Sequence, residues 1–287
     1  MSLSLALSAA LVLASPGEPT LQFGAIQLTT GVRLHYAEQG DPHGHAVILL
    51  HGYSDSWFSY SPILPLIDPK YHVYALDLRG HGESDRPASG YAMRDLAADV
   101  LAFMDDRRLT RVTVVGHSMG SFVAQQLALA APERIARLVL IGSGTTPRQI
   151  VGIAALDSAV QSLRDPVPVE FVREFQVGTV YQPISDTFLD GAINESRKLP
   201  ARVWQGLMAG MLATDPPAGL SGKRIPTAIF WGARDATFGR SEQDALVTLI
   251  DGAELAVYPE TGHALHWERP AEFARDLQAF LDRTTSY

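Results

Sequence analysis

Apolar residues follow two alternating patterns along the chain: short β-branched runs, and longer segments in which apolar positions recur every three or four residues. The short runs predict strands, at 23–28, 32–37, 46–50, 72–78, 111–115, 135–141, 227–231 and 253–258. The longer segments predict helices, at 93–106, 118–131, 241–250 and 270–281. This alternation is typical of an α/β protein with a mostly parallel, doubly wound sheet covered by helices on both faces.

The alternation stops between Thr145 and Arg224. No strand pattern occurs there, and the spacing predicts helices separated by prolines, at 149–163, 169–176, 185–197 and 201–212. We therefore predict a core made of residues 23–144 and 225–287, with a helical cap of residues 145–224 inserted after the sixth strand. Residues 1–22 form a separate N-terminal apolar segment.

Composition narrows the class of protein. The chain carries 31 acidic and 23 basic residues, a formal charge of −8, which argues against a nucleic-acid partner. It has no cysteine, so disulfides, thiol nucleophiles and Cys-ligated metals are excluded. The apolar run at 2–14 is too short to span a membrane and has no positive charge before it. We expect a retained segment, no stable membrane insertion and a cytoplasmic protein, with export as the alternative.

The segment Gly116-His-Ser-Met-Gly120 carries the strongest chemical signal. It joins the predicted strand 111–115 to the predicted helix 118–131, so Ser118 occupies a tight turn that exposes its hydroxyl. The flanking glycines allow the backbones to approach one another closely. At the start of a helix, unpaired N–H groups and the helix dipole favour developing negative charge. Ser118 is therefore the candidate nucleophile.

Two backbone amides are candidates for stabilising an oxyanion beside Ser118. His51-Gly52-Tyr53 follows the apolar strand 46–50, so the Tyr53 amide can face the serine. The Met119 amide opens the helix directly after it. We predict that these two N–H groups form an oxyanion hole, of which one donor typically contributes about 10²–10³ in rate.

Two polar loop residues have the chemistry that a serine nucleophile needs. Asp235 follows the strand 227–231 at the sheet edge where open α/β sheets bind ligands. His263 follows the strand 253–258 and is the candidate base, with His266 as its competitor three residues later. A serine hydroxyl needs an adjacent base, and the imidazolium that forms needs a carboxylate to hold its tautomer.

The chain order Ser118, Asp235, His263 is that of the nucleophile-elbow hydrolases. The sequence resembles the α/β-hydrolase superfamily from about residue 32 to residue 280, apart from the cap. Two further segments support the resemblance, Asp77-Leu-Arg-Gly-His-Gly-Glu-Ser-Asp-Arg-Pro87 and Gly262-His-Ala-Leu-His-Trp-Glu-Arg-Pro270.

The resemblance implies an α/β-hydrolase fold with Ser118 as nucleophile, His263 as base, Asp235 as acid, and Tyr53 and Met119 as oxyanion donors. Haloalkane dehalogenases and epoxide hydrolases resemble this chain elsewhere but carry an aspartate in place of the serine. Those two activities are therefore disfavoured.

The cap would supply much of the substrate pocket, because loops at this sheet edge hold specificity. Large apolar side chains of the cap and of the segment after the third strand are the candidate pocket residues, above all Trp57, Phe58, Phe171, Trp204 and Met208, with Phe175, Phe188, Leu207, Met211 and Leu212 beside them. An apolar lining implies a small-molecule ester or lactone with apolar groups. We expect no metal and no cofactor, and a homo-oligomer is compatible with the sequence.

Three activities remain open from the sequence. The first is hydrolysis of a carboxylic ester or lactone through an acyl-enzyme. The second uses the same triad for cofactor-free perhydrolase or haloperoxidase chemistry, or for hydrolysis of a C–C bond. The third is a hydrolase-like receptor that binds a ligand with slow or no turnover.

Overall fold

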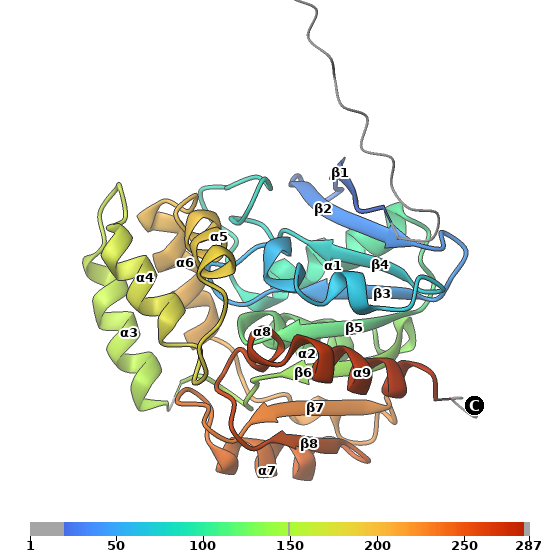
Figure 1. The fold of residues 1–287 in the computed structure, drawn as a ribbon. Helices are drawn as coiled ribbons and strands as arrows, with labels where there is room; N and C mark the ends of the chain where they lie inside the picture. The colour runs from blue at the N-terminus through green and yellow to red at the C-terminus, as the bar shows by residue number, and fades with distance from the viewer. Residues whose placement is uncertain (1–19, 149, 284–287) are drawn as a thin grey trace, which may run out of the picture.

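One sheet of eight strands forms the centre of the described part of the chain, in the order β1-β2-β4-β3-β5-β6-β7-β8 (Figure 1). The computed structural model describes residues 20–148 and 150–283. The strands are β1 Gln22–Gln27, β2 Arg33–Gly40, β3 Ala46–Leu50, β4 His72–Leu76, β5 Val112–His117, β6 Ile135–Ile141, β7 Thr227–Gly232 and β8 Glu254–Tyr258. Strand β2 pairs antiparallel with β1 and β4, and every other neighbouring pair is parallel. The prediction of a mostly parallel sheet is confirmed.

Burial explains which strands lie at the centre. Every residue of β3 to β7 is buried, whereas the edge strands β1 and β8 contain exposed residues. In β3, Ile48 and Leu50 pack on one face of the sheet, and Val47 and Leu49 pack on the other. Apolar runs without polar interruptions therefore predict strands that are covered on both faces.

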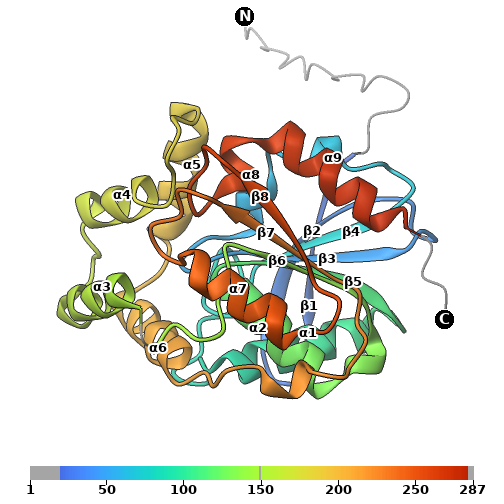
Figure 2. The ribbon, with the colours of Figure 1, turned by 90° about the horizontal axis from the view of Figure 1, so that it is seen from below.

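Helices cover the two faces of the sheet (Figure 2). One face is covered by α1 (Met93–Asp106), α2 (Met119–Ala130) and α7 (Arg240–Leu249). The other face is covered by α9 (Pro270–Leu281), with the short α8 (Leu265–Glu268) before it. This arrangement is the predicted doubly wound sheet.

Four helices lie between β6 and β7, within residues 145–224, the segment called the cap here. They are α3 Val151–Ser162, α4 Val169–Val177, α5 Asp186–Ser196 and α6 Ala201–Leu212. They lie together beside one end of the sheet (Figure 1). Their buried side chains, such as Val160 and Trp204, join the same apolar cluster as the α1–α2 face of the sheet. Since β6 and β7 are parallel, a connection leaving the end of β6 starts at the carboxyl edge of the sheet.

Some boundaries and short elements differ from the sequence expectations. Strand β2 continues to Gly40, beyond the predicted end at residue 37, because its polar residues 38–40 still pair with β4. Strand β4 ends at Leu76, two residues early, because Asp77 turns into a hydrogen-bonded loop. Five short helices were not predicted: η1 Trp57–Tyr60, η2 Leu64–Leu66, η3 Pro132–Arg134, η4 Ala218–Leu220 and α8. Such single turns bury too few residues to leave a periodic pattern.

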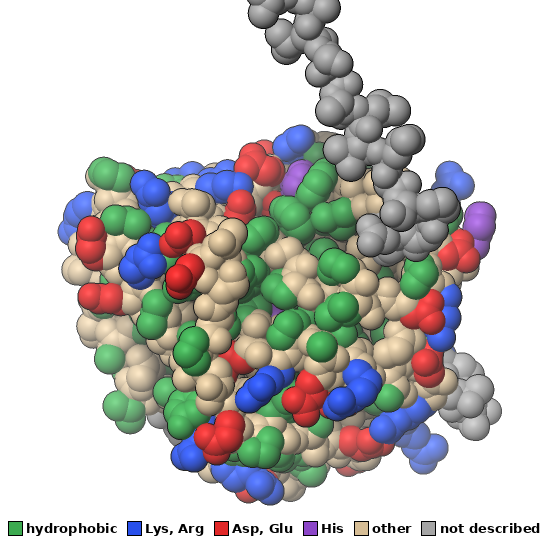
Figure 3. All heavy atoms as spheres, viewed as in Figure 1, with side chains coloured by type: hydrophobic (Ala, Val, Ile, Leu, Met, Phe, Trp, Pro, Cys, Tyr) green, Lys and Arg blue, Asp and Glu red, His purple; other side chains and the backbone are tan. Residues whose placement is uncertain are grey.

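Acidic and basic side chains are interspersed on the face shown in Figure 3, and neither sign forms a large continuous patch there. Among residues 20–148 and 150–283, no helix is both long enough and apolar enough to cross a bilayer. Residues 1–19 of the predicted N-terminal apolar segment lie outside the described residues.

Candidate active site

Ser118 occupies a strained turn between β5 and α2. Its backbone angles are φ 50° and ψ −117°, a region that residues with a side chain rarely adopt. A Cβ atom on Gly116 would lie 2.3 Å from the Gly120 carbonyl oxygen, so only glycine fits at the start of the turn. The Ser118 amide donates to the Ile141 carbonyl at 2.9 Å, which ties the turn to β6. The sequence pattern therefore produces the expected strand–turn–helix corner.

The start of α2 packs directly against the end of β3. A Cβ atom on Gly120 would lie 2.2 Å from the Leu50 carbonyl oxygen and 2.5 Å from that of His51. This close approach brings the Met119 amide, at the first residue of α2, beside the segment that carries Tyr53. Both predicted oxyanion donors therefore flank the corner that holds Ser118; their role stays a prediction.

Asp235 holds His263 in one orientation. The Nδ1–H of His263 donates to Asp235 Oδ2 at 2.9 Å, and both side chains are buried. The other carboxylate oxygen, Oδ1, accepts the backbone amides of Thr237 at 2.7 Å and Phe238 at 3.0 Å. Both oxygens of the acid thus have partners, and Nε2 of His263 is left as the proton-accepting nitrogen.

Glycine makes room for this pair. A Cβ atom on Gly142, which has φ 51°, would lie 2.9 Å from His263 Nδ1. His263 can therefore sit against the end of β6, the strand next to the one that leads into Ser118.

Ser118 and His263 open onto the same cavity of about 60 Å³ between the core and the cap. Its lining is predominantly apolar and comprises Gly52, Tyr53, Asp55, His117, Ser118, Phe122, Ile153, Leu156, Phe175, Gln176, Thr179, Met208, Met211, Thr237, Phe238 and His263. None of these described lining residues is Lys or Arg. The chain ends of β3 and β5 and the cap helices α3, α4 and α6 all contribute, so the site lies where the cap meets the sheet.

Of the five pocket residues singled out from the sequence, Met208 lines the cavity and four do not. The ring of Phe58 stacks on Phe188 of α5 with 5.3 Å between centroids, and Trp57 packs edge-on against Phe23 of β1. Both rings pack on other elements, and neither is among the residues that line the cavity. The assignment of both to the pocket is corrected.

Trp204 and Phe171 belong to the interior of the cap. Trp204 is completely buried and packs edge-on against Tyr53, Phe171 and Phe175. Phe171 lies one turn before Phe175 on α4 and packs against the same Trp204 ring, but it is absent from the lining of the cavity. Hydrophobicity alone does not separate residues that seal a cap from those that line a pocket beneath it.

His266, the competing base, does not line the cavity. It lies on α8, fully buried, and burial lowers its pKa to about 3. Its Nε2 lies 3.4 Å from the Ser59 hydroxyl. The structure therefore brings His263, and not His266, to the cavity with Ser118.

Buried polar residues at the cavity were missed by the sequence reasoning. Asp55, Gln176 and His117 all line it, and Gln176 Nε2 donates to Asp55 Oδ1 at 2.9 Å. Burial raises the pKa of Asp55 to about 7, against the lowering effect of the Gln176 hydrogen bond. Asp55 lies two residues after Tyr53, whose backbone amide is a predicted oxyanion donor. Gln176 lies 121 positions away, and no local pattern links it to Asp55.

The described residues contain no group of three or more His, Asp or Glu side chains arranged to hold a metal ion. The chemistry that this site offers comes from a hydroxyl, an imidazole, a carboxylate and backbone amides.

Comparison with known proteins places the site in a family. The chain is 30% identical to a 2-hydroxy-6-oxononadienedioate/2-hydroxy-6-oxononatrienedioate hydrolase from Burkholderia vietnamiensis, over 88% of this chain and 92% of that protein. It is similar in structure to the 2-hydroxy-6-oxo-6-phenylhexa-2,4-dienoate hydrolase from Rhodococcus sp. strain RHA1, with a TM-score of 0.78, 25% identity, and 92% and 100% of the two chains covered.

An esterase from Exiguobacterium antarcticum superposes with a TM-score of 0.82 over 90% of this chain and 99% of the esterase; at 22% identity this likeness concerns the fold. The proteins to which the chain is similar therefore include an esterase and hydrolases of 2-hydroxy-6-oxo-dienoates. The sequence model of the alpha/beta hydrolase family matches residues 47–276. With its serine elbow, its histidine–aspartate pair and this match over most of its length, the chain belongs to the alpha/beta hydrolase family.

Proposed function

We propose that this protein is a serine hydrolase that cleaves a carboxylic ester or lactone through an acyl-enzyme. One observation carries the proposal: a serine raised on a positive-φ turn and a histidine oriented by a buried aspartate line one apolar cavity. Each group alone has a structural explanation, but their convergence on one cavity supports a nucleophile with its base.

In the first half of the reaction, Ser118 Oγ attacks the ester carbonyl carbon while His263 Nε2 takes the hydroxyl proton. Asp235 accepts the Nδ1–H bond at 2.9 Å and stabilises the imidazolium. Negative charge on the carbonyl oxygen is met by the amides of Tyr53 and Met119. The tetrahedral intermediate then collapses: the C–O bond to the alcohol breaks, and the alcohol leaves with the proton from His263.

In the second half, a water molecule replaces the alcohol. His263 takes a proton from the water, whose oxygen attacks the acyl carbon of the Ser118 ester. Collapse of this second intermediate breaks the bond to Ser118 Oγ, which recovers its proton from His263. The products are one carboxylic acid and the free enzyme.

The cavity favours an uncharged, mostly apolar substrate. Phe122, Ile153, Phe175, Met208 and Met211 provide apolar surface on the core and the cap sides. At about 60 Å³ the cavity is well below the roughly 300–1,000 Å³ of ordinary small-molecule sites, so in this conformation it suits a small group, and a larger one requires movement of the cap. We therefore propose a small or medium acyl or alcohol group.

Hydrolysis of a C–C bond is the second candidate, and the 30% identical hydrolase from Burkholderia vietnamiensis favours it. A dioate substrate carries two carboxylates, and burying such charges requires paired cations. The described lining of the cavity contains no Lys or Arg. The lining therefore favours an ester over a dianionic substrate for this chain.

A panel of p-nitrophenyl esters of increasing acyl length, lactones and a 2-hydroxy-6-oxo-dienoate tests these proposals. We expect ester or lactone turnover that falls by at least 10³-fold in Ser118→Ala and in His263→Ala. The matched controls Ser158→Ala and His43→Ala change exposed residues and should leave the rate unchanged. Turnover of the dienoate alone would favour the second candidate. Ester turnover that survives in Ser118→Ala would overturn the proposed nucleophile.

A further inference from the structure

The segment between β3 and η1, residues 51–56, carries the Tyr53 amide and is here called the oxyanion loop. Three consecutive side chains of this loop form hydrogen bonds with three different helices of the cap. Tyr53 bonds to α6, Ser54 to the last residue of α5, and Asp55 to α4. A loop that only had to end a strand would not need three partners from a separate layer of the molecule.

All three bonds are buried, and those of Tyr53 and Asp55 are short. The Tyr53 hydroxyl donates to the Trp204 carbonyl at 2.6 Å, and its ring packs edge-on against the Trp204 ring at 5.0 Å. The Ser54 hydroxyl donates to Ser196 Oγ at 3.3 Å. Gln176 Nε2 donates to Asp55 Oδ1 at 2.9 Å. Because one loop makes all three of these buried bonds, movement of the cap away from the loop would break them together.

Gln176 connects two of these contacts. Its Nε2 also donates to Ser196 Oγ at 2.7 Å, while the Ser196 hydroxyl proton is used on the Ala192 carbonyl at 3.0 Å. Ser196 Oγ must therefore accept from Gln176, which fixes the orientation of the Gln176 amide and leaves its second proton for Asp55. The contacts form a network rather than independent pairs, so loss of one member weakens the others.

The oxyanion loop is itself strained. Ser54 has φ 65°, the left-handed region that a serine adopts only when its surroundings hold it there. It lies directly after Tyr53, so relaxation of Ser54 toward ordinary angles would rotate the peptide planes beside the Tyr53 amide.

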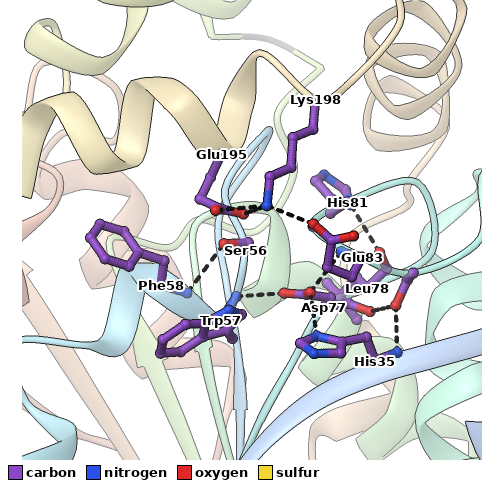
Figure 4. Close-up of polar contacts among 12 residues, drawn as sticks. His35, Ser56, Trp57, Phe58, Asp77, Leu78, His81, Glu83, Glu195 and Lys198 are labelled. Atoms are coloured by element: carbon purple, nitrogen blue, oxygen red, sulfur yellow. Dashed lines mark hydrogen bonds and ion pairs between the residues drawn. The ribbon is translucent and has the colours of Figure 1, made fainter. Parts of the chain in front are cut away.

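The far end of the loop is fixed by the core rather than by the cap (Figure 4). Asp77, just after β4, accepts the Trp57 amide at 2.7 Å through Oδ1. Its Oδ2 accepts the Glu83 amide at 2.9 Å and the His35 ring at 2.8 Å. Burial raises the pKa of Asp77, but these hydrogen bonds outweigh it and hold the pKa below its ordinary value. The core therefore fixes the chain where the loop meets η1, and the cap contacts the middle of the loop.

We propose that the cap positions the Tyr53 amide for oxyanion binding, with Gln176 and Asp55 as positioning residues that transmit the place of the cap to the oxyanion loop. The inference rests on the proposed function. A displacement of about 1 Å in catalytic geometry costs roughly 10²-fold in rate, similar to the loss of an oxyanion donor. Hydrolysis is then coupled to cap closure: an ester meets a complete oxyanion hole only when the cap is seated over it.

The test compares variants that break the Gln176–Asp55 bond with variants that keep it. Gln176→Met and Asp55→Leu remove a donor or an acceptor at similar volume, and Gln161→Met makes the same change at an exposed glutamine of α3. We expect kcat for a p-nitrophenyl ester to fall about 10- to 100-fold in the first two variants, with KM within threefold. Asp55→Asn keeps the acceptor oxygen and should restore most of the kcat lost in Asp55→Leu.

The double variant gives an internal check. If Gln176 and Asp55 act through one bond, the double variant Gln176→Met/Asp55→Leu should lose no more kcat than the worse single variant. Should Asp55→Leu fail to fold, Tyr53→Phe breaks another contact of the same loop and keeps the backbone amide. The proposal would be overturned by a wild-type kcat in Gln176→Met and in whichever of Asp55→Leu and Tyr53→Phe is measured. It would also be overturned by an Asp55→Asn kcat as low as that of Asp55→Leu.

Hydrogen exchange separates this proposal from the proposed function, because it needs no turnover. We expect faster exchange of the backbone amides of residues 52–56 in Gln176→Met than in the wild type or in Gln161→Met. Unchanged exchange would refute positioning by the cap, whatever the activity. Faster exchange in a protein that hydrolyses no ester would instead refute the proposed function and leave the mechanical link standing.

Discussion

The substitution Asp235→Asn offers a sharp test of the triad, because the structure fixes how the new amide must orient. In the wild type, Asp235 Oδ1 accepts two backbone amides, from Thr237 and Phe238. An asparagine must keep its oxygen on those donors, which turns its NH₂ group toward His263 Nδ1. That nitrogen then has to accept a hydrogen bond, so the ring proton moves to Nε2.

A histidine protonated on Nε2 cannot take the proton of Ser118. In serine hydrolases this wrong-tautomer effect lowers kcat by about 10⁴-fold, which corresponds to roughly 5 kcal/mol of transition-state stabilisation. The fold should be little affected, since the amide retains the size of the acid and both backbone hydrogen bonds. The assay is kcat for the best p-nitrophenyl ester, together with the thermal midpoint of each protein.

The matched control is Asp215→Asn, at a side chain that is 84% exposed and pairs with Arg148 on the surface. It should keep the wild-type kcat. If Asp235→Asn stays within tenfold of the wild type while folding normally, the assignment of Asp235 as the orienting acid is refuted.

Two further predictions follow from close packing and burial. Gly120→Ala should lower kcat by at least 100-fold and reduce thermal stability, because the new Cβ would lie 2.2 Å from a backbone oxygen. The control Gly152→Ala in α3, where a Cβ meets nothing within 4 Å, should change neither kcat nor thermal stability. An equal effect of both substitutions would contradict the packing argument. Burial lowers the pKa of His51 to about 4 and that of His266 to about 3. Between these values and pH 6.5 each histidine binds its proton mainly in the unfolded chain, so the free energy of unfolding decreases as the pH is lowered. Burial also lowers the pKa of His81 and of His117 well below the ordinary value, so they act in the same direction. Asp55, whose pKa burial raises to about 7, acts in the opposite direction between about pH 4 and 7, but it is one group against four histidines. The net loss between pH 6 and 4.5 should be about 1.4 kcal/mol or more per pH unit in urea unfolding; a stability that is constant or rises on acidification would contradict it.

The central sheet is the part of the fold that local pattern determines most directly. The run Ala46–Leu50 is apolar throughout because both of its faces are covered, and it predicts a central strand. Polar residues at the end of β2 conceal that the strand continues, since its pairing with β4 depends on a partner more than 30 positions away. Boundaries fail where a long-range partner, rather than a local pattern, decides where a strand ends.

The chemical corner of the site was also accessible from sequence. Ser118 lies between Gly116 and Gly120, where a Cβ atom would come within 2.2–2.3 Å of a backbone oxygen. The glycines that make the motif recognisable in the sequence are therefore the same ones that the geometry of the turn requires. Asp235 and His263 each follow a strand of a parallel sheet, and the carboxyl ends of such strands meet at one edge. Their pairing at 2.9 Å therefore follows from topology once the strands are known.

The pocket could not be predicted in the same way. Trp204 and Met208 lie one helical turn apart on α6 with similar hydrophobicity, yet one seals the cap and the other lines the cavity. The difference depends on how the cap is placed over the core, which involves contacts such as the one between Gln176 and Asp55. No single-sequence pattern encodes the placement of one layer on another.

Covalent labelling of the intact protein with a fluorophosphonate tests the central claim most directly, because its serine adduct does not turn over. Mass spectrometry should find one phosphonyl group, on the peptide that contains Ser118, in the wild type and none in Ser118→Ala. Labelling should slow markedly in His263→Ala, which lacks the base. An adduct on a different residue, or ester hydrolysis by a protein whose Ser118 stays unlabelled, would contradict the role assigned to this serine.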